Sequence, residues 1–145
     1  MAHTHTEEVL NSLLRGELAA TETYQQAMAK VHAEPDAADL RQIHVDHRTA
    51  ANELRKYVHT VGGQPDHGSG TWGAFAKAVE GTASLLGNSS ALHALKEGEL
   101  HGLKEYRDAL NEPTLPETAR EFIRSQLLPQ TEQHIRVLER LLNAK

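Results

Sequence analysis

Four stretches of this 145-residue chain carry apolar residues at spacings of three and four positions. An α-helix turns once every 3.6 residues, so this spacing gathers the apolar side chains on one face of a helix. The stretches cover residues 6–30, 36–62, 89–111 and 114–141, and a weaker pattern of the same kind covers residues 72–86. The sequence therefore predicts an all-α fold with four long helices and a short extra helix.

The connections between these predicted helices differ in length. Pro35 interrupts the chain after the first helix, and Asn111 and Pro113 end the third, so both of those connections are short. The segment 62–70 is too rich in glycine and proline to continue a helix, and with the short extra helix it forms a long crossover. This pattern predicts a four-helix bundle whose second and third helices run parallel. An up-down-up-down bundle with a decorated loop is the alternative.

Capping residues and prolines set the predicted helix ends. Asp36 is placed to cap the second helix, and Ser89 or Ser90 is placed to cap the third. Pro129 lies inside the fourth helix. Because proline lacks an N–H and its ring meets the preceding turn, we expect a bend one turn before His134.

Length, charge and residue content narrow the partners of the chain. A length of 145 residues fits a single domain over residues 1–145, and a net charge of −5 offers no basic surface to a nucleic acid. No apolar run approaches the roughly 18 residues of a spanning helix, and the polar, acidic amino terminus is unlike a secretory signal. We therefore expect no membrane partner and a cytoplasmic location. The chain has no cysteine and ten histidines, so metal ligands must be histidine or carboxylate.

The first and third predicted helices resemble each other at an offset of 82 residues. The matching positions are Leu10 and Leu92, Leu13 and Leu95, Gly16-Glu17-Leu18 and Gly98-Glu99-Leu100, Tyr24 and Tyr106, and Ala27 and Ala109. A duplicated pair of helices gives a bundle with pseudo-two-fold symmetry, so repeated residues on the inner face should converge near its axis.

Each long helix has one polar residue within its apolar stripe. These residues are Glu17, His47, Glu99 and His134, each seven positions from an inward residue on either side. A buried, ionised carboxylate without a partner costs on the order of several kcal/mol, so the four side chains should meet one another, a cation or water. With His44 as an extra nitrogen donor, this set suits a single iron, zinc or manganese ion. The alternative is a metal-free network that fixes the helix register.

The spacing of these polar residues raises a geometric difficulty. Glu17 and His47 are 30 residues apart, whereas Glu99 and His134 are 35 residues apart. At a rise of 1.5 Å per residue, the difference amounts to about 7 Å along the bundle unless the connections absorb it.

The segment Leu10–Tyr24, which reads LNSLLRGELAATETY, resembles the first helix of bacterioferritins. The loop GGQPDHGSGTWG is similar to the start of the crossover in small bacterial ferritin-like proteins of unassigned function. The resemblance implies a ferritin-like four-helix bundle over the single domain, and it implies that Glu17 is a metal ligand.

The chain departs from the di-iron pattern of the ferritin-like superfamily at two positions. Di-iron members carry Glu-x-x-His on the second and fourth helices, and the glutamates bridge the two metals. Here His44 and Thr131 stand three residues before His47 and His134. The resemblance therefore implies a degenerate Glu/His site for a single metal ion, and neither a di-iron ferroxidase nor iron storage is expected.

These observations predict a ferritin-like metal-binding protein that takes part in metal handling or has weak oxidase activity. Its predicted metal ligands are Glu17, His44, His47, Glu99 and His134. Tyr24 and Tyr106 are expected to lie in the core and to hydrogen-bond the carboxylates, whereas the acidic residues on other helix faces are expected to be solvated. Those acidic residues are Glu22, Asp46, Glu53 and Glu97.

Two other interpretations remain open at this point. One is a non-enzymatic structural or stress-related helical module that has lost the metal site. The other is an interaction domain that uses the crossover around Trp72 to hold a partner or a second copy, and a homodimer is compatible with each interpretation.

Overall fold

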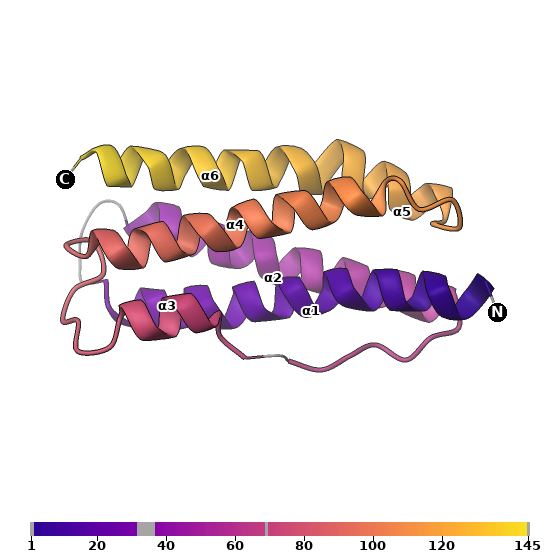
Figure 1. Cartoon of the computed structure of the whole chain (residues 1–145), viewed down its shortest axis with the longest axis horizontal. Helices are drawn as coiled ribbons and strands as arrows, with labels where there is room; N and C mark the ends of the chain where they lie inside the picture. The colour runs from indigo at the N-terminus through magenta and orange to yellow at the C-terminus, as the bar shows by residue number, and fades with distance from the viewer. Residues whose placement is uncertain (1, 32–36, 69, 145) are drawn as a thin grey trace.

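The computed structural model describes residues 2–31, 37–68 and 70–144 (Figure 1). All regular secondary structure within these ranges is helical. The elements are α1 (Ala2–Ala29), α2 (Ala37–Thr60), α3 (Gly73–Ala78), α4 (Ser89–Ala109), α5 (Glu117–Phe122), the π-helical turn η1 (Ile123–Leu127) and α6 (Leu128–Asn143). The predicted all-α class is confirmed. None of the helices in the described ranges has the length and apolar character needed to cross a membrane.

Four long rods lie side by side along the long axis of the molecule (Figure 1). Three of them are α1, α2 and α4, and the fourth is the continuous run of α5, η1 and α6. The closest packing is between α1 and α2 and between α4 and α6. The chain therefore forms a four-helix bundle.

The chain between α2 and α4 returns along the length of the bundle beside α1 (Figure 1). The Gln64 N–H donates to Glu7 near the start of α1 at 3.1 Å, and the Trp72 N–H donates to Thr23 near its end at 2.9 Å. Because this connection runs from one end of the bundle to the other, α2 and α4 point in the same direction (Figure 1). The extra helix α3 lies within this connection and packs against α4.

The helix ends differ in part from those predicted. The residue that caps α4 is Asn88, whose side chain accepts a hydrogen bond from the Ala91 N–H at 3.0 Å, whereas Ser89 and Ser90 already belong to the helix. The short extra helix is also shorter than the predicted 72–86, because turns replace it after Ala78. The predicted cap Asp36 and the neighbouring Pro35 lie outside the described residues.

A π-helical turn lies where Pro129 was expected to bend the fourth helix. Proline has no N–H to donate, and its ring would meet the carbonyl of Ser125 four residues earlier. The chain forms the wider turn η1 there and resumes as α6, with Pro129 in its first turn. A wide turn of this kind is a known way of fitting a residue that an α-helix cannot accommodate. Leu127 and His134, on either side of the proline, both remain buried.

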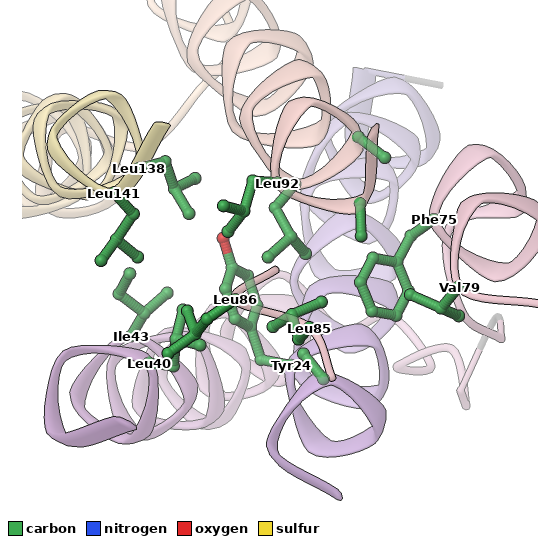
Figure 2. Close-up of a cluster of buried hydrophobic side chains, with 14 residues drawn as sticks. Tyr24, Leu40, Ile43, Phe75, Val79, Leu85, Leu86, Leu92, Leu138 and Leu141 are labelled. Carbon is green, nitrogen blue, oxygen red and sulfur yellow. The ribbon is translucent and has the colours of Figure 1, made fainter. Parts of the chain in front are cut away.

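The buried apolar side chains form two clusters that occupy opposite halves of the bundle. Figure 2 shows the first cluster, in which Tyr24 lies among side chains from α2, α3, α4 and α6. The second cluster gathers around Leu10, Leu54 and Ile123. Glu17 lies on α1 between Leu10 of one cluster and Tyr24 of the other, so the polar residues of the apolar stripes fall between the two clusters.

Candidate metal centre

The four polar residues of the apolar stripes are buried between the two clusters. The exposed fraction is 5% for Glu17, 4% for His47, 1% for Glu99 and 2% for His134. The unequal spacing in the sequence does not separate His134 from Glu99 along the bundle axis, because Nδ1 of His134 lies 3.2 Å from Oε1 of Glu99. The turn η1 takes up part of the longer spacing, since a π-helix uses more residues per turn than an α-helix.

The imidazole of His47 lies between the two buried glutamates. Its Nδ1 is 2.5 Å from Oε2 of Glu17, and its Nε2 is 2.7 Å from Oε2 of Glu99. Burial alone would lower the pKa of His47, but the negative charges of Glu99 and Glu17 outweigh it and raise this pKa well above 6.5. In the metal-free protein His47 is therefore an imidazolium that donates to a carboxylate from each nitrogen.

Tyr24 and Tyr106, which occupy matching positions of the two similar segments, donate hydrogen bonds across the bundle. The hydroxyl of Tyr24 on α1 donates to Oε2 of Glu99 on α4 at 2.7 Å, and the hydroxyl of Tyr106 on α4 donates to Oε1 of Glu17 on α1. Burial, together with the nearby carboxylates, raises the pKa of both tyrosines well above 10. Both hydroxyls therefore keep their protons. The predicted bonding of the tyrosines to the carboxylates is observed, and each tyrosine pairs with the glutamate of the other helix.

His134 contacts a carboxylate that the sequence analysis placed in solvent. Its Nε2 lies 2.9 Å from Oδ2 of Asp46, whose side chain is 24% exposed. Burial would raise the pKa of Asp46, but hydrogen bonds from His134 and Gln42 lower it. The prediction for Asp46 was wrong, and its position three residues after the buried Ile43 was the available signal. The five side chains of Glu17, Asp46, His47, Glu99 and His134 are called the polar layer from here on.

Glu99 is the central member of the polar layer. One imidazole faces each of its oxygens, and the two imidazole rings have centroids 4.8 Å apart. Burial would raise the pKa of Glu99, but the charges and hydrogen bonds of His47 and His134 hold it far below its ordinary value. Burial and the charge of His47 oppose the charged form of His134, but its hydrogen bonds with Asp46 and Glu99 and the negative charge of Glu99 raise its pKa. Glu99 is thus an ionised carboxylate in the interior.

Three of the predicted ligands converge on one point. His47, Glu99 and His134 each offer one ligand atom, and these atoms all lie within 4.8 Å of one another. Nitrogen and oxygen ligands of a tetrahedral ion lie roughly 3.4 Å apart, because each bond to the metal is about 2.0–2.1 Å long. Nε2 of His47 lies 2.7 Å from Oε2 of Glu99 and Nδ1 of His134 lies 3.2 Å from Oε1, so each imidazole lies at a comparable distance from one oxygen of this carboxylate.

The other predicted ligands lie outside this group of three. Glu17 contacts the nitrogen of His47 that points away from Glu99. His44 is half-buried, and its Nε2 has no hydrogen-bond partner within the described ranges. Thr131, three residues before His134, donates its hydroxyl to the backbone carbonyl of Leu127 at 2.7 Å.

Trp72 in the crossover packs inward against the bundle. Its ring lies over Gly98, where an added Cβ would come within 2.3 Å of the ring. The ring also meets Tyr24 edge-on, with centroids 6.0 Å apart. Glycine at position 98 therefore allows the crossover to cover α4 next to the polar layer.

The charge of the polar layer depends on its protons. Its three carboxylates are Glu17, Asp46 and Glu99, and its two imidazoles are His47 and His134. With neutral imidazoles, the layer would hold three uncompensated negative charges in a low-dielectric interior, which is costly. Two protons or one divalent cation reduce this charge equally, to a single negative charge, and a set of imidazoles and carboxylates suits zinc, manganese and iron.

Comparison with known families finds a match that covers residues 5–112 and is described as a domain of unknown function, DUF2383. Searches among curated proteins and among solved structures give no significant match. The matched residues include Glu17, Asp46, His47 and Glu99 but not His134. Because the match spans well over half of the sequence, the chain belongs to the DUF2383 family.

Proposed function

We propose that this chain binds one divalent metal ion in its polar layer, with His47, Glu99 and His134 as the ligands. The observation that carries the proposal is the way the two histidines are held. His47 turns Nε2 and His134 turns Nδ1 toward Glu99, and the opposite nitrogen of each ring meets a second carboxylate. A histidine that binds a metal almost always donates its other N–H to such a partner.

Glu17 and Asp46 have the same role in this proposal. Each accepts from the outward nitrogen of one imidazole, Glu17 at 2.5 Å from Nδ1 of His47 and Asp46 at 2.9 Å from Nε2 of His134. These contacts fix the tautomer and orientation of both rings, so that the inward nitrogens are free to bind a cation once their protons leave. A bound ion would supply Lewis acidity, and the chain would supply a fixed, largely neutral environment.

The architecture supports a distant relationship with ferritin-like proteins, which is part of the proposal. The support consists of the parallel α2 and α4, the long crossover and the glutamate and histidine ligands at mid-bundle. Neither position that would carry a bridging glutamate offers one, because His44 and Thr131 stand there. Handling of a single metal ion therefore fits this centre better than di-iron chemistry.

A metal-free structural module is the second candidate, and one observation favours it. Every side-chain oxygen of Glu17 and Glu99 and every ring nitrogen of His47 and His134 already has a hydrogen-bond partner. A network satisfied in this way can fix the register of four helices without an ion. The two candidates differ in whether a cation displaces the protons of the imidazoles.

Metal titration of the untagged, chelator-treated protein tests the proposal. We expect cobalt, zinc or manganese to bind at about one ion per chain, measured by plasma mass spectrometry, and to raise the melting temperature as a ligand of the folded state must. His134→Gln and Glu99→Gln should remove this binding while far-ultraviolet circular dichroism shows unchanged helicity. His59→Gln, at an exposed histidine of α2, is the matched control and should bind as the wild type does.

The opposite result would favour the structural module. Less than about a tenth of an ion per chain, with no thermal shift for any of the three metals, would rule out the proposed centre.

A further inference from the structure

A small cavity of about 30 Å³ lies between α1 and α4, beside the proposed metal centre. Its lining includes Glu17, His47 and Glu99 of the polar layer, and it also includes His101 and Glu105. The side chain of His101 is 73% exposed and that of Glu105 is 28% exposed. The cavity therefore joins the buried carboxylates to residues at the surface.

Glycines open this cavity between the two helices. Gly16 on α1 and Gly98 and Gly102 on α4 line it. Trp72 covers Gly98, whereas a Cβ added at Gly102 would meet nothing within 4 Å, and one at Gly16 would lie 3.2 Å from Glu105. The open side of the cavity is therefore the side of Gly102 and Glu105, away from Trp72.

A larger surface groove continues from that open side. It has a volume of about 290 Å³, runs between the same two helices and shares Leu13 and Glu105 with the small cavity. Its other charged residues are Glu8, Asp108, Glu112 and His5, of which His5 pairs with Glu112 at 2.8 Å and Asp108 pairs with Lys104 at 2.7 Å. The carboxylates outnumber the cations, so the groove has a negative potential that concentrates cations near Glu105.

On the basis of the proposed metal centre, we propose that divalent cations reach it through this groove, and that the carboxylate of Glu105 passes them into the cavity between α1 and α4. Glu105 is suited to this step because its contacts are weak. Its Oε2 accepts from Ser12 at 3.4 Å, and its Oε1 lies 3.7 Å from the exposed His101. A cation can therefore exchange for these contacts at little cost, with His101 as a second donor at the opening.

A competing route would lie on the other side of the bundle. A surface cavity of about 310 Å³ near α2 and η1 includes Asp46 and Glu53 in its lining, but none of His47, Glu99 or His134. The cavity between α1 and α4 has two of those three ligands in its wall. The geometry therefore favours the side of Glu105.

Stopped-flow fluorescence tests the route, because Trp72 is the one tryptophan of the sequence and lines the cavity. Binding of Co²⁺ should quench this fluorescence. We expect Glu105→Gln to slow loading at low salt at least about threefold and to weaken its salt dependence, because it removes a charge that steers cations. The amount of Co²⁺ bound at equilibrium should stay at the wild-type value.

Substitutions at Gly102 test the passage itself. Gly102→Leu should slow loading by about tenfold or more by filling the open side, and Gly102→Ala should slow it less. The alanine variant keeps the test valid if the leucine variant folds poorly. Gly73→Ala, at a helical glycine with open space around it and no place in the cavity, is the matched control. Glu53→Gln makes the same change of charge at the competing cavity, and both controls should load at the wild-type rate.

The outcomes separate the two proposals. Wild-type loading rates in Glu105→Gln and both Gly102 variants, with one ion still bound, would overturn the route and leave the metal centre standing. Slow loading in Glu53→Gln alone would also overturn it, in favour of the opposite side. Absence of Co²⁺ binding to the wild type would remove the centre and the route together.

Discussion

Two tyrosine hydroxyls donate to the polar layer, each to a different glutamate. Tyr106 supplies the hydrogen bond to Oε1 of Glu17, and Tyr24 supplies one to Oε2 of Glu99. A buried carboxylate oxygen that loses its donor keeps the cost of its lost hydration, so each hydroxyl should matter more than an exposed one.

Tyr106→Phe should therefore lower the free energy of unfolding by about 1–3 kcal/mol, because it leaves Oε1 of Glu17 without this donor. Denaturant titration of the metal-free protein measures the change. Tyr57→Phe removes the same atom from a half-buried ring whose hydroxyl makes one 3.4 Å contact, with the Thr118 carbonyl, and should cost less than about 0.5 kcal/mol. Equal losses in the two variants would show that Glu17 does not depend on Tyr106.

The buried members of the polar layer were predictable from the sequence, whereas Asp46 was not. Glu17, His47, Glu99 and His134 each interrupt a regular apolar stripe, so helical periodicity alone turns them inward. Asp46 lies at the flank of its stripe, and its contact with His134 depends on how α2 and α6 pack. Its position three residues after Ile43 places it beside the buried stripe, but that position alone does not identify His134 as its partner.

At the scale of elements, the side chain of Asn88 links the end of α3 to the start of α4. The side chain of Asn88 accepts from the Ala91 N–H at 3.0 Å and donates to the Ala78 carbonyl at 3.0 Å and to the Thr82 hydroxyl at 2.6 Å. Sequence analysis placed the cap at Ser89 or Ser90, since serine is also a good cap. The Asn88 amide accepts one hydrogen bond at the helix start and donates two to the preceding turn, whereas a serine hydroxyl has a single proton to donate.

Asn88→Ala should lower the free energy of unfolding by about 1–2 kcal/mol, because it removes the cap of α4. Asn88→Asp keeps the acceptor and loses the donors, so it should fall between Asn88→Ala and the wild type. Ser89→Ala and Ser90→Ala alter exposed side chains inside the helix and should stay within about 0.5 kcal/mol of the wild type. Thermal denaturation compares the four variants, and a larger effect at either serine would contradict the assignment of the cap.

At the scale of the whole molecule, the four helices share one charged layer. Helical periodicity and the long glycine-rich connection predicted the four long helices and the return of the chain along the bundle. The sequence predicted a disturbance of the fourth helix at Pro129 but not its form as the wide turn η1, and it did not predict that α3 ends at Ala78. The protonation of the shared layer then links the folding of every long helix to pH.

The stability of the metal-free protein should be greatest between about pH 4.5 and 6.5. Burial opposes the charged form of His47, but Glu99 and Glu17 raise its pKa above the ordinary 6.5, so its contribution is complete below that pH and declines as pH rises through the folded value. The pKa of Glu99 is lowered from 4.5, so its contribution is complete above 4.5 and declines as pH falls. Urea titration at a series of pH values should show this maximum.

His47→Gln should flatten the alkaline side of that profile, since it removes the group whose proton is lost there. An unchanged alkaline slope in this variant would contradict the assignment. A bound divalent cation should have the opposite dependence on pH, with a greater stabilisation at higher pH, because it competes with the imidazole protons.

The crossed pairing of the tyrosines makes the two halves of the chain depend on each other. The donor that completes the carboxylate of α1 comes from α4, and the donor that completes the carboxylate of α4 comes from α1. Neither half can bury its own glutamate with a full set of partners. Each half of the chain therefore holds a donor that the buried glutamate of the other half needs, so we expect separated halves to be less stable than the intact chain.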